Sequence, residues 1–349
     1  MNHRIKPPHS NKKPVTTMKH DVQGTPAWPS FTGDAQLVGT SPSGRVTVYV
    51  DSSLGQQAQQ NAQDLLNDAD RVVTANDGIF GTTGGPVSVI VFALGGATDG
   101  TGGADHSGCD YTTGNAIEVD ASYGNSARVS ALFEAELSEC SMNGNLCGES
   151  TGEALSRWCA AVVGNNALAD FATAPQWVQD GMANWVDKTE DTDQDGDSIG
   201  CGMAFISWLI SEGHGLEKIA PTMANLGDSG TLAQLYATLT SDSSSNAWTN
   251  FQNAISGLPN GANSITSDDP FDGLAQPLQT NLDSRTAELV GRVFASMIAD
   301  LSAGRHPEQI AANVRAAMVP ASRPLTPPVC SPKSKRLLPP TKRRSSKTA

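Results

Sequence analysis

The sequence contains no apolar run of about 18 residues, so it predicts no transmembrane helix. No apolar stretch follows the Lys and His residues near the N-terminus, and the pattern of a secretory signal peptide is therefore missing. There is no CxxC pair, which argues against a zinc ribbon or a thiol redox motif. GxGxxG and Walker patterns are missing too, so dinucleotide and P-loop chemistry are not indicated.

Basic residues are scarce outside the C-terminal end of the chain. Of the 23 Lys and Arg residues, eight lie between Arg323 and Lys347, in a segment without any acidic residue. The rest of the chain has 15 basic and 36 acidic residues, a net charge of −21. We expect this acidic body to repel nucleic acid and anionic membranes, whereas the basic tail can contact anionic surfaces.

Cysteine usage leaves the cellular compartment open. An even number of cysteines fits the disulfides of an exported protein, and it fits buried thiols equally well. The six cysteines are Cys109, Cys140, Cys147, Cys159, Cys201 and Cys330.

Composition divides the chain into five parts. Residues 1–40 are rich in Pro, Lys, Ser and Thr and predict a disordered leader. Apolar stretches recur through residues 41–258 and predict the folded domain. A polar linker (259–283), an amphipathic helical hairpin (284–319) and a basic, Pro-rich disordered tail (320–349) are expected to follow.

The order of apolar patterns predicts an α+β fold, with strands first and helices afterwards. Strands are expected over 46–50, 86–94 and 116–119, with a helix over 58–73 between the first two. In the mainly helical half, helices are expected over 127–140, 152–163, 177–186, 202–210, 232–239 and 247–255.

Two of these predicted helices carry carboxylates at suggestive positions. Glu136 and Glu139 are three residues apart, so they lie on one face of their helix. Glu153 lies near the start of the next helix, where the helix dipole favours an anion. The two segments around them are AELSE (135–139) and GEALSR (152–157).

Taken together, these segments resemble the zinc site of the gluzincin metallopeptidases, in particular the thermolysin-like enzymes. In that family one helix carries HExxH, with two histidine ligands and a general-base glutamate, and a second helix supplies a glutamate as third ligand. The resemblance places Glu136 at the general base and Glu153 at the third ligand. Ala135 and Glu139 stand at the two histidine positions, and Arg157 at an orienting aspartate.

The resemblance implies a zincin-like fold for residues 41–258. In such a fold a β-sheet precedes the active-site helix, and its edge strand pairs with substrate; the stretch 115–120 is the candidate for that strand. The chain is also similar to a group of uncharacterised bacterial proteins. They share an HxGC segment (106–109), the AExxE and GExLSR segments, and a later SIGC element (198–201).

The missing histidines decide the expected chemistry. Alanine cannot bind a metal, so Glu139 and Glu153 remain as candidate ligands, and carboxylates suit Ca²⁺ better than Zn²⁺. We therefore expect no metal or a weakly bound divalent cation. The leading hypothesis is a non-catalytic homologue that binds a peptide or protein in the former substrate cleft or serves as a structural module. The alternative is an active metal-dependent hydrolase, a peptidase with Glu136 as general base.

An acidic run further along the chain resembles a calcium loop. Asp191, Asp193, Asp195 and Asp197 have the alternating spacing of EF-hand ligands. The glutamate required at the twelfth position is absent, because Gly202 stands there. An acidic surface turn between two helices explains the same pattern.

Three further residues are secondary candidates. His106 lies in a polar, Gly-rich loop, where functional residues often gather. Asp180 belongs to WVQDGMA, which is similar to the WxxEGxA element of other gluzincins and offers a substitute for Glu153. His214 lies between two glycines and is a candidate for a transition-state histidine. A structural turn, core packing and a solvent-facing loop, respectively, are the simpler interpretations.

Overall fold

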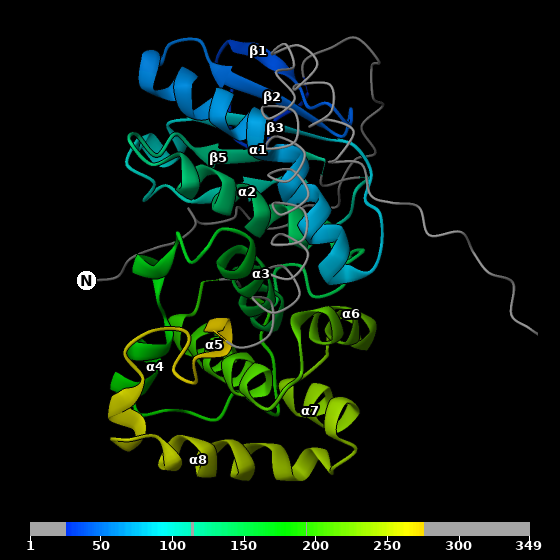
Figure 1. Ribbon diagram of the computed structural model, residues 1–349, viewed down its shortest axis with the longest axis vertical. Coiled ribbons are helices and arrows are strands. Elements are labelled where there is room, and N and C mark those ends of the chain that lie inside the picture. Colours follow the sequence, from blue (N-terminus) through cyan, green and yellow to red (C-terminus); the bar gives the residue numbers. More distant parts are fainter. Residues whose placement is uncertain (1–25, 113–114, 193, 276–349) are drawn as a thin grey trace, which may run out of the picture. The chain divides into compact units, whose positions relative to one another are not determined.

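The computed structural model describes residues 26–112, 115–192 and 194–275 (Figure 1). The chain divides into two compact units between Asp283 and Ser284, and all described residues lie in the first unit. The predicted helical hairpin (284–319) and basic tail (320–349) lie outside the described residues.

The first half of the described chain forms a five-stranded mixed sheet with the strand order β1-β2-β3-β5-β4. Strands β2 (Val46–Asp51), β3 (Val87–Phe92) and β5 (Ala116–Asp120) are parallel to one another. Strands β1 (Ala35–Thr40) and β4 (Ala104–His106) pair antiparallel at the two edges. With the helices that follow, this sheet confirms the predicted α+β class.

Helix α1 (Gln56–Phe80) connects β2 to β3 and packs on one face of the sheet together with α2 (Ser126–Ser141) (Figure 1). Alternation along the strands puts every second side chain on this face, as with the fully buried Val46 and Val48 of β2. Apolar residues of α1 recur at helical spacing and meet them, which gives the main core.

The opposite face of the sheet is covered in part by residues that composition assigned to the leader. Trp28 packs edge-on against Tyr49, and Phe31 packs edge-on against Phe92. The buried carboxylate of Glu118 accepts hydrogen bonds from the backbone N–H of Ser30 at 2.9 Å and of Phe31 at 2.6 Å. The prediction of a disordered leader up to residue 40 is therefore wrong from residue 26 onwards, since aromatic anchors and β1 hold this segment.

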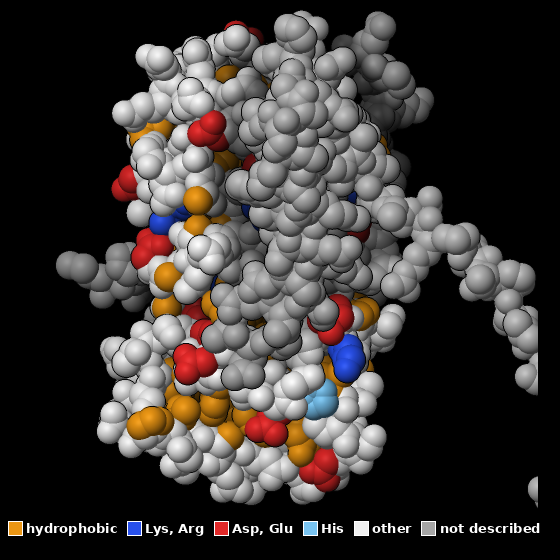
Figure 2. Space-filling view, in the orientation of Figure 1, with side chains coloured by type: hydrophobic (Ala, Val, Ile, Leu, Met, Phe, Trp, Pro, Cys, Tyr) orange, Lys and Arg blue, Asp and Glu red, His pale blue; other side chains and the backbone are white. Residues whose placement is uncertain are grey.

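The second half of the described chain is helical, as predicted. Phe251 lies at the centre of an aromatic cluster with Trp177, Phe205 and Trp208, which joins α4, α5 and α8. Hydrophobic side chains also gather over the lower, helical part of the face seen in Figure 2. The helices are α3 (Ser150–Val163), α4 (Ala174–Gln179), α5 (Gly196–Ser211), α6 (Leu216–Leu226), α7 (Leu232–Thr240) and α8 (Ala247–Gly257).

The first part of the predicted linker packs on the domain instead. Ile265 is 4% exposed and belongs to the main core. Asp268 accepts hydrogen bonds from the backbone N–H groups of Thr173 and Ala174, at the start of α4. The linker prediction is thus wrong for residues 259–275, because a buried apolar side chain and a helix-capping carboxylate fix them. Short 3₁₀ turns are η1 (Leu94–Gly96), η2 (Ala169–Phe171), η3 (Ser244–Asn246), η4 (Gly261–Ser264) and η5 (Gly273–Ala275).

One correction bears directly on the site. The stretch 115–120 was the predicted edge strand, but it forms β5, which lies between β3 and β4. The edge beside α2 is the three-residue strand β4, which ends at His106.

Candidate functional site

Helix α2 lies at the centre of the candidate site. It begins after Asn125, whose side chain accepts a hydrogen bond from the backbone N–H of Arg128 and caps the helix. Almost every residue of α2 is buried, including Glu136 at 1% and Glu139 at 3% exposure. A buried carboxylate is costly unless it has hydrogen-bond or charge partners, so the surroundings of these two acids determine what the site can do.

Strand β4 supplies a partner for both acids. Nε2 of His106 lies 2.8 Å from Oε2 of Glu139 and 3.7 Å from Oε2 of Glu136. The other ring nitrogen, Nδ1, contacts the carbonyl oxygen of Gly108. Because a carbonyl oxygen only accepts, Nδ1 carries a proton and Nε2 is the atom directed at the carboxylates. His106, a secondary candidate in the sequence, thus lies beside Glu136 and Glu139.

A disulfide borders this cluster. It joins Cys109, which follows β4, to Cys147, which precedes α3. The sulfur of Cys147 lies 3.9 Å from Nε2 of His106 and 3.9 Å from Oε2 of Glu139. Within the described residues, His106, Glu139 and Cys147 are the one group of three or more potential metal-ligand side chains whose donor atoms converge within 4.8 Å.

Glu153 has a different partner, one turn further along its own helix. Nε of Arg157 donates to Oε1 of Glu153 at 2.8 Å, and both side chains are largely buried, at 10% and 3% exposure. The i, i+4 spacing on α3 brings the two groups together, and the first-turn position of Glu153 favours its negative charge.

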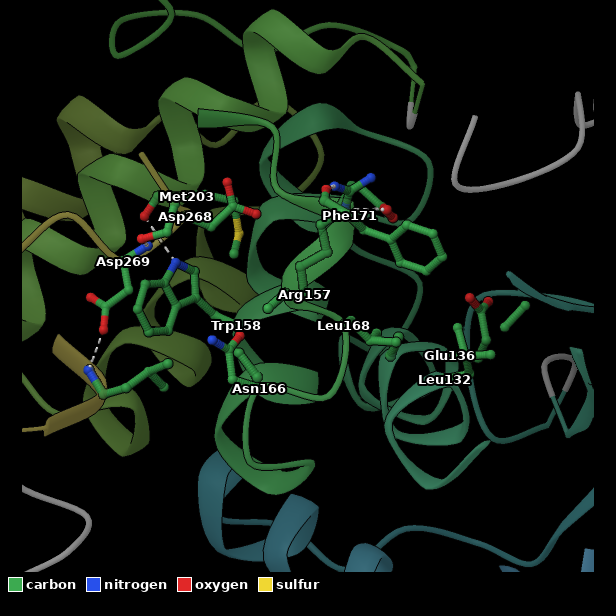
Figure 3. Close-up of a pocket in the computed structure, with 17 residues that line it drawn as sticks. Leu132, Glu136, Arg157, Trp158, Asn166, Leu168, Phe171, Met203, Asp268 and Asp269 are labelled. Carbon is green, nitrogen blue, oxygen red and sulfur yellow. Dashed lines mark hydrogen bonds and ion pairs between the residues drawn. The ribbon is translucent and has the colours of Figure 1, made fainter. Parts of the chain in front are cut away.

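A pocket between α2 and α3 lies beside Glu136 and the Glu153–Arg157 pair. Glu136, Glu153 and Arg157 all line it, while Glu139 lies against His106 instead. Figure 3 shows Glu136 and Leu132 at one end of the pocket and Asp268, Asp269 and Met203 at the other. The apolar part of the wall includes Ala104, Leu132, Trp158, Leu168, Phe171 and Met203.

The predicted calcium loop has a structural role at the start of α5. Asp195 is the N-cap of this helix, and its carboxylate accepts from the backbone N–H of Asp197 at 2.8 Å. Partial burial and the negative charges of Asp180 and Asp195 raise the pKa of Asp197 to about 6. Asp191 is exposed, and Asp193 lies outside the described residues. The capping role matches the simpler interpretation of an acidic turn.

The other two secondary candidates lie away from the pocket of Glu136. Asp180 ends α4 as its C-cap residue. His214 follows α5 and lines a separate depression with Trp208, Glu212 and Tyr236. Neither residue lines the pocket that Glu136 and Glu153 share, so this geometry gives no support to their proposed roles.

Sequence reasoning missed the most deeply buried acid of α2. Glu134 is 0% exposed, and neither of its oxygens has a hydrogen-bond partner among the described residues. Burial raises its pKa well above the ordinary value, and the nearby Arg71 offsets this only in part. The sequence contained a signal for this burial. Glu134 lies between the apolar run 131–133 and Ala135, and it is not on the helix face of Glu136 and Glu139.

No family model, curated protein or solved structure matches this chain. The helices of the described residues also include none that is long and apolar enough to cross a membrane. The case for function therefore depends on the geometry of the site.

Proposed function

We propose that residues 26–275 form a zincin-like domain that binds an extended peptide without cleaving it. The observation that carries this proposal is the pairing of both candidate ligand carboxylates with nitrogen groups of the protein itself. Glu139 contacts His106 at 2.8 Å, and Glu153 contacts Arg157 at 2.8 Å. By the resemblance to gluzincins, Glu139 and Glu153 are the residues that would hold a metal ion.

The residues present do not fit a zinc ion at the gluzincin positions. Ala135 has no ligand atom, and Glu153 is engaged by a permanent cation. An Arg157 guanidinium neutralises a carboxylate, but it has no open coordination position at which a water could be polarised and deprotonated. Arg157 thus neutralises the charge of Glu153 but cannot activate a water molecule as a metal ion would.

Strand β4 offers a place for a peptide backbone. Gly103 accepts from the N–H of Asp120, and Ser107 donates to the carbonyl of Ala116, so these residues face β5. In an antiparallel pair the hydrogen-bonding direction alternates, so the backbone groups of Ala104 point away from the sheet. Ala104 is 2% exposed, so an extended peptide can add to this edge as a further strand only by displacing what covers it.

The neighbouring pocket provides an anchor for one side chain of such a peptide. Ala104 of β4 belongs to both the edge and the pocket wall. Leu168, Phe171 and Met203 make much of that wall apolar (Figure 3). A large apolar side chain is the group that this wall fits, since burying it contributes roughly 1.5–3 kcal/mol.

Charge favours a basic peptide around that anchor. The chain without its basic end has a net charge of −21, which attracts cationic ligands and repels nucleic acid. The proposed ligand is therefore an extended segment with a large apolar residue flanked by Lys or Arg.

A peptide-binding measurement with two matched variants tests this proposal. Leu168 lines the pocket and is partly exposed, whereas Leu37 lies on the opposite edge strand and is 57% exposed. We expect Leu168→Glu to weaken binding of a peptide selected from a library by at least about tenfold, a loss of about 1.4 kcal/mol. Leu37→Glu should bind like the wild type. Equal binding by the wild type and both variants would contradict a pocket-anchored peptide.

The alternative function is a metal-dependent hydrolase with Glu136 as its base, and it requires a rearrangement of the site. A cation held by Glu139 and Glu153 would have to displace the contacts to His106 and Arg157. The presence of Glu136 in the same pocket as Glu153 is the observation in its favour. Cleavage activity separates the two functions, whereas peptide binding is expected for both.

A further inference from the structure

We propose that opening the Cys109–Cys147 disulfide creates a zinc site from His106, Glu139 and Cys147. Their donor atoms are Nε2, a carboxylate oxygen and Sγ, and all lie within 4.8 Å of one another. This ligand set shares only Glu139 with the ligand positions that the gluzincin resemblance assigns, because it uses neither residue 135 nor Glu153.

The separations suit a tetrahedral zinc ion. Zinc bonds of about 2.0–2.3 Å to oxygen, nitrogen and sulfur place neighbouring ligand atoms roughly 3.3–3.6 Å apart. The observed separations are 2.8 Å from His106 to Glu139, and 3.9 Å from Cys147 to each of the other two. Side-chain shifts of less than about 1 Å therefore bring all three atoms to bonding distance.

The imidazole is already oriented as a metal ligand. Nδ1–H of His106 donates to the carbonyl oxygen of Gly108, which fixes the ring and its tautomer and directs Nε2 at Glu139. Metal-binding histidines commonly donate their second nitrogen to a backbone carbonyl in this way. This hydrogen bond is an observation independent of the convergence of the three donor atoms.

Charge also favours a cation at this position. Glu136 and Glu139 are at most 3% exposed and both lie near the same imidazole nitrogen. A zinc ion would neutralise the carboxylate of Glu139 and the thiolate of Cys147 together. Glu136, at 3.7 Å from Nε2 of His106, is a further oxygen donor for the fourth position.

The disulfide controls the site because a thiolate, and not a disulfide sulfur, is the ligand that zinc requires. A dithiol reductant supplies the two electrons that break the sulfur–sulfur bond, becomes a cyclic disulfide, and passes its two protons to Cys109 and Cys147. Zinc then replaces the thiol proton of Cys147, which leaves to solvent. Both cysteines are only half-buried, so a small reductant can reach them.

Two variants that both lack the disulfide provide a matched test. Cys109→Ser frees the thiol of Cys147, whereas Cys147→Ser removes the proposed ligand. Both are made in the full chain with Cys330→Ser, since residue 330 lies outside the described residues. Binding is followed without reductant and without oxygen, using Co²⁺ as a spectroscopic probe and Zn²⁺ in competition with a chromophoric chelator.

We expect Cys109→Ser to bind one Co²⁺ with a thiolate charge-transfer band, and Cys147→Ser to bind at least about 100-fold more weakly, since even indirect losses at metal sites reach this size. His106→Ala added to Cys109→Ser should weaken binding similarly. Cys201→Ser, which changes a buried thiol elsewhere, should have no effect. The oxidised Cys330→Ser parent should give no thiolate band.

Equal affinity of Cys109→Ser and Cys147→Ser would overturn the proposal, and so would a Cys109→Ser protein without a thiolate band. Circular dichroism establishes that each variant is folded. If Cys109→Ser does not fold, the parent reduced with a phosphine is measured instead, and a lack of metal-induced thiolate absorption there also overturns the proposal.

Discussion

Three of the four buried glutamates of α2 and α3 have different surroundings. Glu139 lies against His106, and Glu153 against Arg157. Glu134 has neither oxygen hydrogen-bonded among the described residues and faces Arg71 only at a distance. A buried acid in such surroundings is easier to keep neutral than charged, so it should lower stability wherever it must ionise.

The pH dependence of unfolding should reveal this cost. The pKa of Glu134 is raised in the folded state, so its protonated form contributes stability fully below the unfolded pKa of about 4.3. That stability is lost as pH rises through the folded pKa. We expect Glu134→Gln, which cannot ionise, to gain unfolding free energy relative to wild type as pH rises from 4, by up to about 1.4 kcal/mol per pH unit.

Urea unfolding between pH 4 and 8 measures this difference. The control is Glu217→Gln, because Glu217 is an exposed acid on α6. If the unfolding free energies of the wild type and Glu134→Gln changed in parallel between pH 4 and 8, Glu134 would ionise in the folded protein without a cost in stability.

Spacing alone predicts some of the residue contacts and not others. Glu153 and Arg157 are four apart on one helix, so their pairing follows from helical geometry. His106 and Glu139 are 33 positions apart, and their contact depends on where a three-residue strand pairs. Local sequence does not determine such a pairing, which is why His106 was only a secondary candidate.

At the scale of elements, the apolar pattern predicted the long pieces well. The strands β2, β3 and β5 and the helices α2, α3, α7 and α8 were expected within two residues of their observed bounds, because each has a clear apolar pattern. The predictions 58–73, 177–186 and 202–210 were wrong by several residues at one end or both, since the helices there are α1, α4 and α5. The short edge strands β1 and β4 lack such a pattern, and α6 contains Pro221, which argues against a helix. These elements were missed for those reasons.

The segment 259–275 supplies a prediction at the same scale. Oδ1 of Asp268 accepts from Thr173 N–H at 2.8 Å and from Ala174 N–H at 2.7 Å, so one side chain joins this segment to the start of α4. Asp268→Ala leaves both donors without this acceptor, and we expect it to lower the unfolding free energy by about 1–3 kcal/mol. Chemical denaturation measures the loss.

Asp268→Asn is the matched control, because the amide keeps an oxygen acceptor of the same size at this position. Burial raises the pKa of Asp268, so the exchange for a neutral group should cost less than truncation. Equal losses in the two variants would show that the hydrogen bonds to α4 contribute little.

On the scale of the whole domain, the order of sheet and helices was predictable, and the boundaries were not. Residues 26–40 and 259–275 belong to the folded body, although they lie outside the expected 41–258. Composition marks both extensions as polar. A few anchors, among them Phe31 and Ile265, nevertheless fix them to the folded body.

We propose that this domain keeps a peptidase-like site without its chemistry. The most direct test of this proposal is the cleavage of a broad peptide library by the oxidised protein, followed by mass spectrometry with Zn²⁺, Mn²⁺ or Ca²⁺ added in turn. Wild type and Glu136→Gln are compared. We predict no metal-dependent cleavage by either protein, because Arg157 and His106 engage the carboxylates that a metal would need. Cleavage that requires a metal and disappears in Glu136→Gln would contradict the account and establish the hydrolase.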